Sequence, residues 1–220
     1  MKKKQPHTDK TTIPLPVLLG ETRTMYCWCQ ADKKELVSNG FNWDVVESLP
    51  ELCNNSETLL LDLDIETLSL SQYRRKLKNE FKAASHKRTQ ICKKIRYALL
   101  VAKSNHKIPG HYQRRAYPLI IEDLFNLATL CGHFKDELAL TGFDQNEAVS
   151  LKELSLQLQN EDVALGALEI DCRALRKDFI CAYKKLYSSA QTLRNCAFAV
   201  FPLDSPRRNG YYSRYRKEHR

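Results

Sequence analysis

The sequence predicts an all-α protein: a bundle of two tandem helical repeat units whose long antiparallel helices are related by pseudo-twofold symmetry. Three observations lead to this prediction. The 220-residue chain contains only 7 Gly and 8 Pro, fewer than the many turns of a sheet-rich fold require. Its second half repeats features of its first half. Its clearest apolar pattern alternates by three and four residues, which is the period of a buried helix face.

The repeat is visible as two ordered blocks of identities. When the chain is shifted by 102 positions, Gly40-Phe41 aligns with Gly142-Phe143, and ten of the 24 positions from 29 to 52 are identical. Further along, a shift of 98 positions aligns Phe81 with Phe179. The difference of four residues is about one helical turn, which a helix can absorb with little rotation of its face. We therefore infer that one helical unit has been duplicated.

The repeat sets the expected organisation of the chain. Residues 1–20 form a flexible basic arm, 21–105 the first repeat, 106–117 a linker, 118–201 the second repeat and 202–220 a basic tail rich in Tyr and Arg. The two repeats are expected to share one compact domain.

Each repeat is expected to begin with one helix, over about 22–38 or 119–139. Gly40 and Gly142 then stand where a helix C-terminus favours a left-handed residue. Asn42 and Asp144 follow as candidate N-caps of a second helix. Two further pairs have the capping-box spacing, namely Ser48 with Glu51 and Ser150 with Glu153.

A long third helix in each repeat carries the three-and-four alternation, and the pattern predicts that one face of it is buried. In the second repeat the row is Cys172, Leu175, Phe179, Ala182, Leu186, Ser189, Leu193, Cys196 and Val200. In the first repeat it is Arg74, Leu77, Phe81, Ala84, Arg88, Ile91, Ile95, Ala98 and Ala102. Residues 61–66 alternate with period two instead, so the stretch 61–70 is expected to be either helix or irregular loop.

The eight cysteines do not have the spacing of a disulfide framework, and most fall on apolar helical positions. Reduced thiols in the cytosol are the better interpretation, so the protein is expected to be cytoplasmic. No stretch has the roughly 18 apolar residues that a membrane span needs.

Charge is distributed unevenly along the chain, whose formal net charge is +9. Residues 42–73 contain seven acids and no Lys or Arg, whereas residues 74–103 contain eleven Lys or Arg and one acid. Two interpretations stay open. Acidic and basic helices could pair within the bundle, or the basic residues could bind RNA or another polyanion.

The second interpretation names two sets of residues. The basic helix of residues 74–96 contributes Arg74, Arg75, Lys78, Lys82, Lys87, Lys93, Lys94 and Arg96. The tail contributes Arg207, Arg208, Tyr211, Tyr212, Arg214 and Tyr215, in which aromatic rings between cations could stack on unpaired bases.

Catalytic and cofactor motifs are not found. The phosphate-binding loops and the di-iron helix pair are absent from the sequence, so no cofactor is expected. The sharpest metal hypothesis is a zinc site formed by Cys27, Cys29, Cys131 and His133. Residues two apart on a helix point about 200° from each other, which argues against such a site.

The end of the last long helix, Phe201-Pro202-Leu203-Asp204-Ser205-Pro206, resembles a group of uncharacterised bacterial helical proteins. Members of that group close with phenylalanine-glycine, aspartate-serine-proline and glutamate-tyrosine, whereas this chain has Pro202 for the glycine and Arg207 for the glutamate. The resemblance covers the C-terminal helix, its cap and the two-unit layout. It implies an all-α fold and a bacterial source, and it implies no activity.

The function expected from the sequence is therefore non-catalytic: a helical scaffold or interaction module for an unidentified protein partner, with a homo-oligomer also possible. The alternative is a nucleic-acid-binding or ribosome-associated protein. A metalloprotein or enzyme is the third class.

Overall fold

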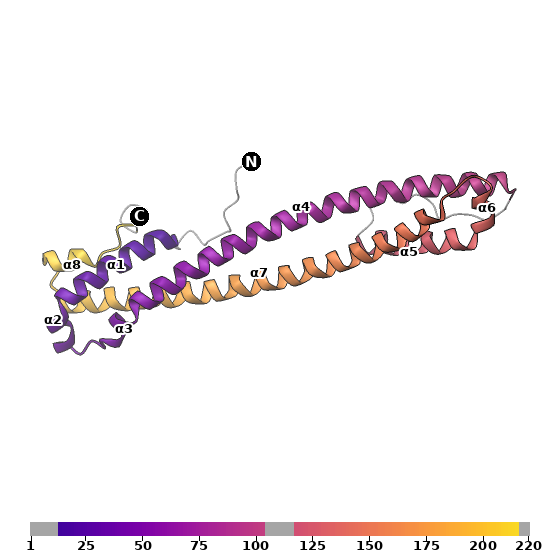
Figure 1. Ribbon diagram of the computed structural model, residues 1–220. Helices are drawn as coiled ribbons and strands as arrows, with labels where there is room; N and C mark the ends of the chain where they lie inside the picture. Colours follow the sequence, from indigo (N-terminus) through magenta and orange to yellow (C-terminus); the bar gives the residue numbers. More distant parts are fainter. Residues whose placement is uncertain (1–12, 104–116, 216–220) are drawn as a thin grey trace. The chain divides into compact units, whose positions relative to one another are not determined.

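The described part of the chain, residues 13–103 and 117–215 of the computed structural model, is all-helical (Figure 1). This confirms the predicted fold class at the level of long helices that pack together. Two helices are long, α4 (Leu49–Val101) and α7 (Gln145–Val200). The others within the described residues are α1 (Leu15–Ala31), α2 (Lys33–Ser38), α3 (Asp44–Glu47), α5 (Tyr117–His133), α6 (Lys135–Ala139) and α8 (Pro206–Gly210).

The chain divides into two units. Unit 1 comprises Met1–Asp64 and Arg173–Arg220, and unit 2 comprises Ile65–Cys172. Each long helix therefore contributes one part to each unit. The predicted repeats are continuous segments of chain, whereas unit 1 combines the start of the first predicted repeat with the end of the second.

The core of unit 1 is built by the first helix, the start of α4 and the end of α7. Its buried residues come from α1 (Leu15, Leu18, Leu19, Met25, Cys29), from α2 to α4 (Leu36, Val46, Leu49, Cys53) and from the chain after residue 185 (Leu186, Ala190, Leu193, Ala197, Phe201, Tyr211), together with Ile13. Phe179 is half-buried against this cluster. The predicted buried row of the second repeat is confirmed, since each of its nine members is buried or half-buried.

The core of unit 2 joins the rest of α4 to α5, α6 and the start of α7. Its α4 residues include Leu77, Phe81, Ala84, Ile91 and Ile95, and the other helices add Leu124, Leu127, Cys131, Leu138, Leu151 and Leu158. Phe81 stacks on Tyr117 at 3.8 Å between ring centroids. In the predicted row of the first repeat only Arg74 is exposed.

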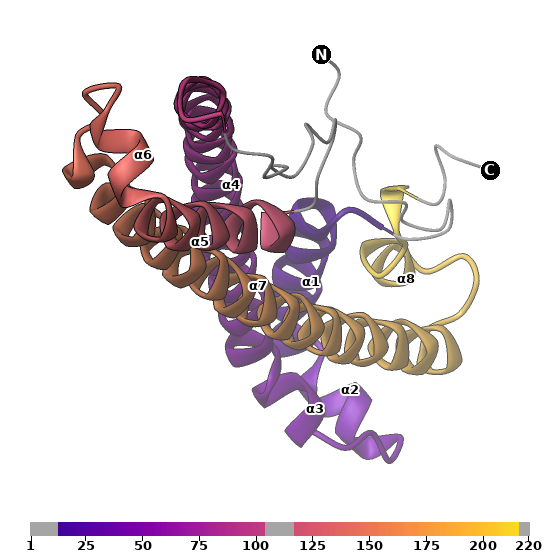
Figure 2. The same ribbon diagram turned by 90° about the vertical axis from the view of Figure 1, so that its right-hand side faces the viewer.

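Within unit 2 the segments of α4 and α7 run antiparallel. Thr67 contacts Cys172, Tyr73 donates to Glu161, and Lys87 donates to Ser150, so the partner number falls as the number along α4 rises. The second view of the ribbon shows α5 beside α7 (Figure 2). Antiparallel long helices, which the sequence predicts, are thus present in this unit.

The two predicted glycine C-caps are confirmed. Gly40 has φ of 81° and Gly142 has φ of 69°. After each glycine a phenylalanine amide donates to the carbonyl five residues earlier, Phe41 to Leu36 at 3.1 Å and Phe143 to Leu138 at 3.2 Å. This is the Schellman arrangement, in which a left-handed residue ends the helix and its last carbonyls are satisfied.

The predicted N-caps have mixed outcomes. Asp144 Oδ1 accepts from the Asn146 amide at 2.9 Å and caps α7, and Asn42 Oδ1 accepts from the Asp44 amide at 3.0 Å before α3. The capping boxes are wrong. The hydroxyls of Ser48 and Ser150 donate to the carbonyl three residues earlier, at 3.0 and 2.9 Å, and do not cap a following turn.

Several predicted boundaries are also wrong. The first helix begins at Leu15, inside the predicted arm, because Pro16 fits its first turn and the apolar side of Leu15, Leu18 and Leu19 is buried in unit 1. It ends at Ala31, and the rest of the predicted 22–38 helix is α2. The second and third predicted helices of the first repeat form the single helix α4, and residues 61–70 lie inside it. The expectations for residues 1–12 and for most of the linker lie outside the described residues.

Candidate functional site

Some of the basic residues of α4 have partners on α7 and others do not. Those with partners lie at the two edges of the face that packs on the core, where they meet acids and a serine of α7 within unit 2. Arg74 pairs with Glu169 at 2.5 Å, and Lys94 pairs with Glu147. Lys87 donates to the Ser150 hydroxyl at 2.8 Å. Pairing between the acidic and basic helices, the first of the two charge interpretations, therefore accounts for Arg74 and Lys94, and Lys87 has a neutral hydrogen-bond partner.

The remaining predicted cations of α4 lie on another face, which we call the outer row: Arg75, Lys78, Lys82, Lys93 and Arg96. All five are exposed, and no ion pair or hydrogen bond joins them to any other residue that the structure describes. At about 100° of rotation per residue, they fall within about 60° of one another around the helix axis. The sequence therefore predicted a basic helix correctly but could not divide its cations into paired and unpaired.

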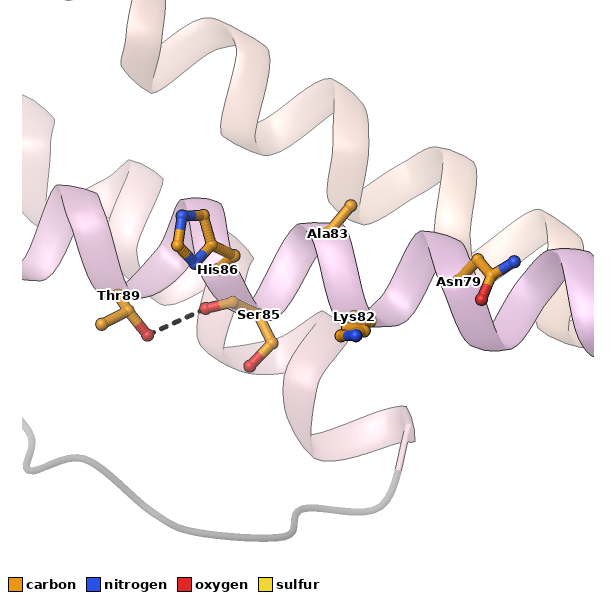
Figure 3. A pocket seen from close by; sticks show the side chains of 6 residues that line it. All are labelled: Asn79, Lys82, Ala83, Ser85, His86 and Thr89. Atoms are coloured by element: carbon orange, nitrogen blue, oxygen red, sulfur yellow. Dashed lines mark hydrogen bonds between the residues drawn. The ribbon is translucent and has the colours of Figure 1, made fainter.

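A shallow hollow of ≈ 640 Å³ lies along the same stretch of α4. Its described lining comes from Asn79, Lys82, Ala83, Ser85, His86 and Thr89. Figure 3 shows Lys82, Ser85 and Thr89 along one edge of the helix, with the Thr89 hydroxyl donating to the Ser85 carbonyl at 2.9 Å. Because these residues belong to a single helix, the hollow is an open surface and not an enclosed site.

The basic tail packs against unit 1. The Tyr211 side chain is fully buried, and its hydroxyl donates to Asp32 Oδ2 at 3.0 Å. Burial and the neighbouring Cys29 and Asp32 raise the pKa of Tyr211. Arg207 pairs with Asp32 at 3.2 Å and with Glu35 at 2.9 Å. The Glu35 pKa is lowered, chiefly by its hydrogen bond from Arg207.

The other tail residues also have partners in unit 1. Arg208 donates to the carbonyls of Phe198 and Phe201, both at 3.0 Å, at the end of α7. The Tyr212 ring packs on Phe198 at 4.7 Å between centroids, and the Tyr215 amide donates to Glu21 at 3.2 Å. Of the six predicted tail residues, Arg207 and Arg214 are exposed and the other four are buried or half-buried. Tyr211 has no surface on which a base could stack.

The four residues of the zinc hypothesis are not brought together. Cys29 lies in the core of unit 1 and Cys131 in the core of unit 2, whereas Cys27 and His133 are exposed. The described residues contain no group of three or more His, Cys, Asp or Glu side chains that could hold a metal ion.

The thiols behave as core residues. All eight cysteines are free, and only Cys27 and Cys181 are exposed. Burial raises the pKa of Cys29 to about 12 and that of Cys131 to about 11, and it also raises the pKa of Cys53, Cys92 and Cys196. Thiols that stay protonated at neutral pH are poor nucleophiles and poor metal ligands.

A second surface of unit 2 was missed by the sequence reasoning. Val149, Leu156, Val163 and Ile170 follow one another at intervals of seven residues along α7, and they are 57%, 49%, 69% and 65% exposed. We call them the apolar row. The core residues Leu151 and Leu158 of the same helix point to the opposite side. The seven-residue spacing is visible in the sequence, but only the packing shows that this row is left outside the core.

Comparisons with protein-family models, with curated proteins and with solved structures found no match to this chain. Among the described helices, none is both long enough and apolar enough to cross a membrane.

Proposed function

We propose that the protein is a non-catalytic helical interaction module, in which the bundle presents the apolar row of α7 to a helix of a partner protein. The observation that carries the proposal is the exposure of four aliphatic side chains at heptad spacing on the side of α7 that faces away from its core. The seam between two packed helices uses two positions of each seven-residue repeat, and this row supplies one of them. Isolated exposed aliphatic residues are common, but an aligned row is typical of an interaction site.

The neighbours of the apolar row suit a closely approaching helix. Between Leu156 and Ile170 the neighbours are Gln159, Asn160, Gly166 and Ala167, which carry no charge, whereas the charged Lys152 and Glu153 lie between Val149 and Leu156. Small and neutral side chains allow close approach from Leu156 to Ile170. Burying the exposed half of four aliphatic side chains is worth about 4 kcal/mol before the costs of association. That amount favours a partner that docks reversibly over an obligate homodimer, whose interfaces are far larger.

The duplication belongs to the same proposal: we infer two copies of one helical unit related by a pseudo-twofold axis. Equivalent local geometry supports it. Besides the two Schellman glycines, Cys29 and Cys131 are both fully buried, and so are Leu36 and Leu138. Glu21 and Asp123 are also at equivalent positions of the two copies. Each of these acids pairs with a buried arginine, Glu21 with Arg194 and Asp123 with Arg88.

We infer a cytoplasmic protein, because eight free cysteines suit a reducing compartment. The proposal of a non-catalytic role is supported by the raised pKa values of the buried thiols, which disfavour their use as nucleophiles.

Site-specific photo-crosslinking in the native cell tests the proposed function. Val163 is replaced by a benzoylphenylalanine, and Gln157, an exposed residue on a different face of α7, is replaced in the matched control. We expect one discrete protein adduct from position 163, no adduct from position 157, and loss of the first in a Leu156→Glu background. An adduct mass of two chains would identify a second copy as the partner. No discrete adduct from any of the four row positions would refute the proposal.

A further inference from the structure

The outer row of α4 carries positive charge that the described part of the chain does not balance. Arg74, Lys87 and Lys94, which belong to the same helix, are satisfied by α7. Pairing within the bundle therefore explains only part of the basic helix. The five cations of the outer row face solvent together, and such an arrangement is the electrostatic footprint of a polyanion-binding surface.

The outer row consists of two groups separated by an uncharged interval. Arg75, Lys78 and Lys82 form the first group, and Lys93 and Arg96 form the second. At 1.5 Å per residue, Lys82 and Lys93 are about 16 Å apart along the axis. The interval on this face presents Ser85, His86 and Thr89, and no Lys, Arg, Asp or Glu.

Two groups of cations at this separation match two phosphate strands. The major groove of B-form DNA is about 12 Å wide between its backbones, so the phosphates on its two sides lie slightly farther apart than that. A helix that crosses the groove would place one group on each strand, with small polar side chains over the opening. The deep and narrow major groove of A-form RNA does not offer this spacing.

Other anionic partners fit the row less well. Single-stranded nucleic acid is bound by aromatic rings interleaved with cations. Tyr97 is 63% exposed next to Arg96, and His86 is exposed between the two groups, but no exposed aromatic side chain lies between the cations of either group, and Tyr211 of the tail is buried. An anionic membrane surface needs a broad apolar face beside the cations, and this face of α4 has none between Arg75 and Arg96. We propose that the outer row of α4 binds the phosphate backbones of duplex DNA across the major groove.

The test measures binding of the full chain to a labelled 20-base-pair DNA duplex by fluorescence anisotropy across a salt series. Five phosphate contacts predict a slope of log K against log salt of about −4.5, or about 500-fold weaker binding at 200 mM than at 50 mM salt. The variant Arg75→Gln/Lys78→Gln/Lys82→Gln should lower the slope to about −2, and Lys93→Gln/Arg96→Gln should lower it to about −3.

The matched control is Lys76→Gln/Lys94→Gln, in which both lysines are paired with acids of α7, and it should keep the wild-type slope. Circular dichroism at 222 nm establishes that every variant keeps its helix content. The Leu156→Glu variant should also keep the slope, so failure of this proposal and failure of the apolar-row proposal are separate results.

Three results would overturn the inference. The first is no binding to the duplex at 50 mM salt. The second is equal loss of slope in the outer-row variants and in the control. The third is tighter binding to single-stranded DNA, to an RNA duplex or to phosphatidylserine vesicles than to the DNA duplex.

Discussion

Removing the Tyr211 side chain tests whether the tail is an integral part of unit 1. Its hydroxyl donates to Asp32, a carboxylate that is only 2% exposed, and its ring lies near Phe201 at 6.0 Å between centroids. Tyr211→Phe removes one hydrogen bond to a buried charged group and should lower the free energy of unfolding by about 2 kcal/mol. Tyr211→Ala also removes the buried ring, so the loss should be about 5 kcal/mol.

Both tryptophans of the chain, Trp28 and Trp43, lie in unit 1, so their fluorescence during urea denaturation reports that unit alone. A β-carbon on Gly210 would lie 2.9 Å from the Trp28 ring, so Trp28 also senses whether α8 is docked. Leu203→Ala is the control, because Leu203 is 79% exposed and its loss should change little. If Tyr211→Ala unfolds at the same urea concentration as Leu203→Ala, the tail does not stabilise unit 1 and the reasoning fails.

Three further predictions concern the glycine caps, a buried ion pair and the thiols. Gly142→Ala should destabilise the protein by about 1 kcal/mol, because φ of 69° is strained for a residue with a β-carbon. Gly20→Ala, inside α1, should instead stabilise it by about 0.5 kcal/mol, and equal effects of the two variants in thermal denaturation would contradict this reasoning. Asp123→Ala leaves the buried Arg88 without this carboxylate and should cost about 3 to 5 kcal/mol in chemical denaturation, whereas Glu169→Ala, at an exposed pair, should cost less than about 1 kcal/mol. Ellman's reagent at pH 8 should react rapidly with Cys27 and Cys181 only, because a thiol with a pKa of about 12, such as Cys29, is about one part in ten thousand thiolate at that pH. Rapid labelling of Cys29 or Cys131 would show that these core positions open readily.

The cations of the candidate site could be recognised in the sequence. Which of them have partners on α7 and which face solvent could not. The concentration of Lys and Arg after residue 73 is a property of composition, and it identified the basic helix. Whether Arg74 or Arg75 meets an acid depends on which side of α4 faces α7, and adjacent residues on a helix point about 100° apart. The tail shows the same difficulty, since Tyr211 and Tyr212 look equivalent in sequence, yet one is fully buried and the other half-buried.

What the sequence determined by itself is local: helix as the secondary structure, the glycine ends at Gly40 and Gly142, and the buried rows that contain Phe81 and Phe179. These follow from backbone preference and from the periodicity of neighbouring residues, which act over a few turns of chain. Only the tertiary structure decided that α4 and α7 each contribute to two units, that the tail packs into unit 1, and that Val149 to Ile170 and the outer row remain exposed. Those outcomes depend on contacts between residues far apart in the chain, which no local pattern specifies.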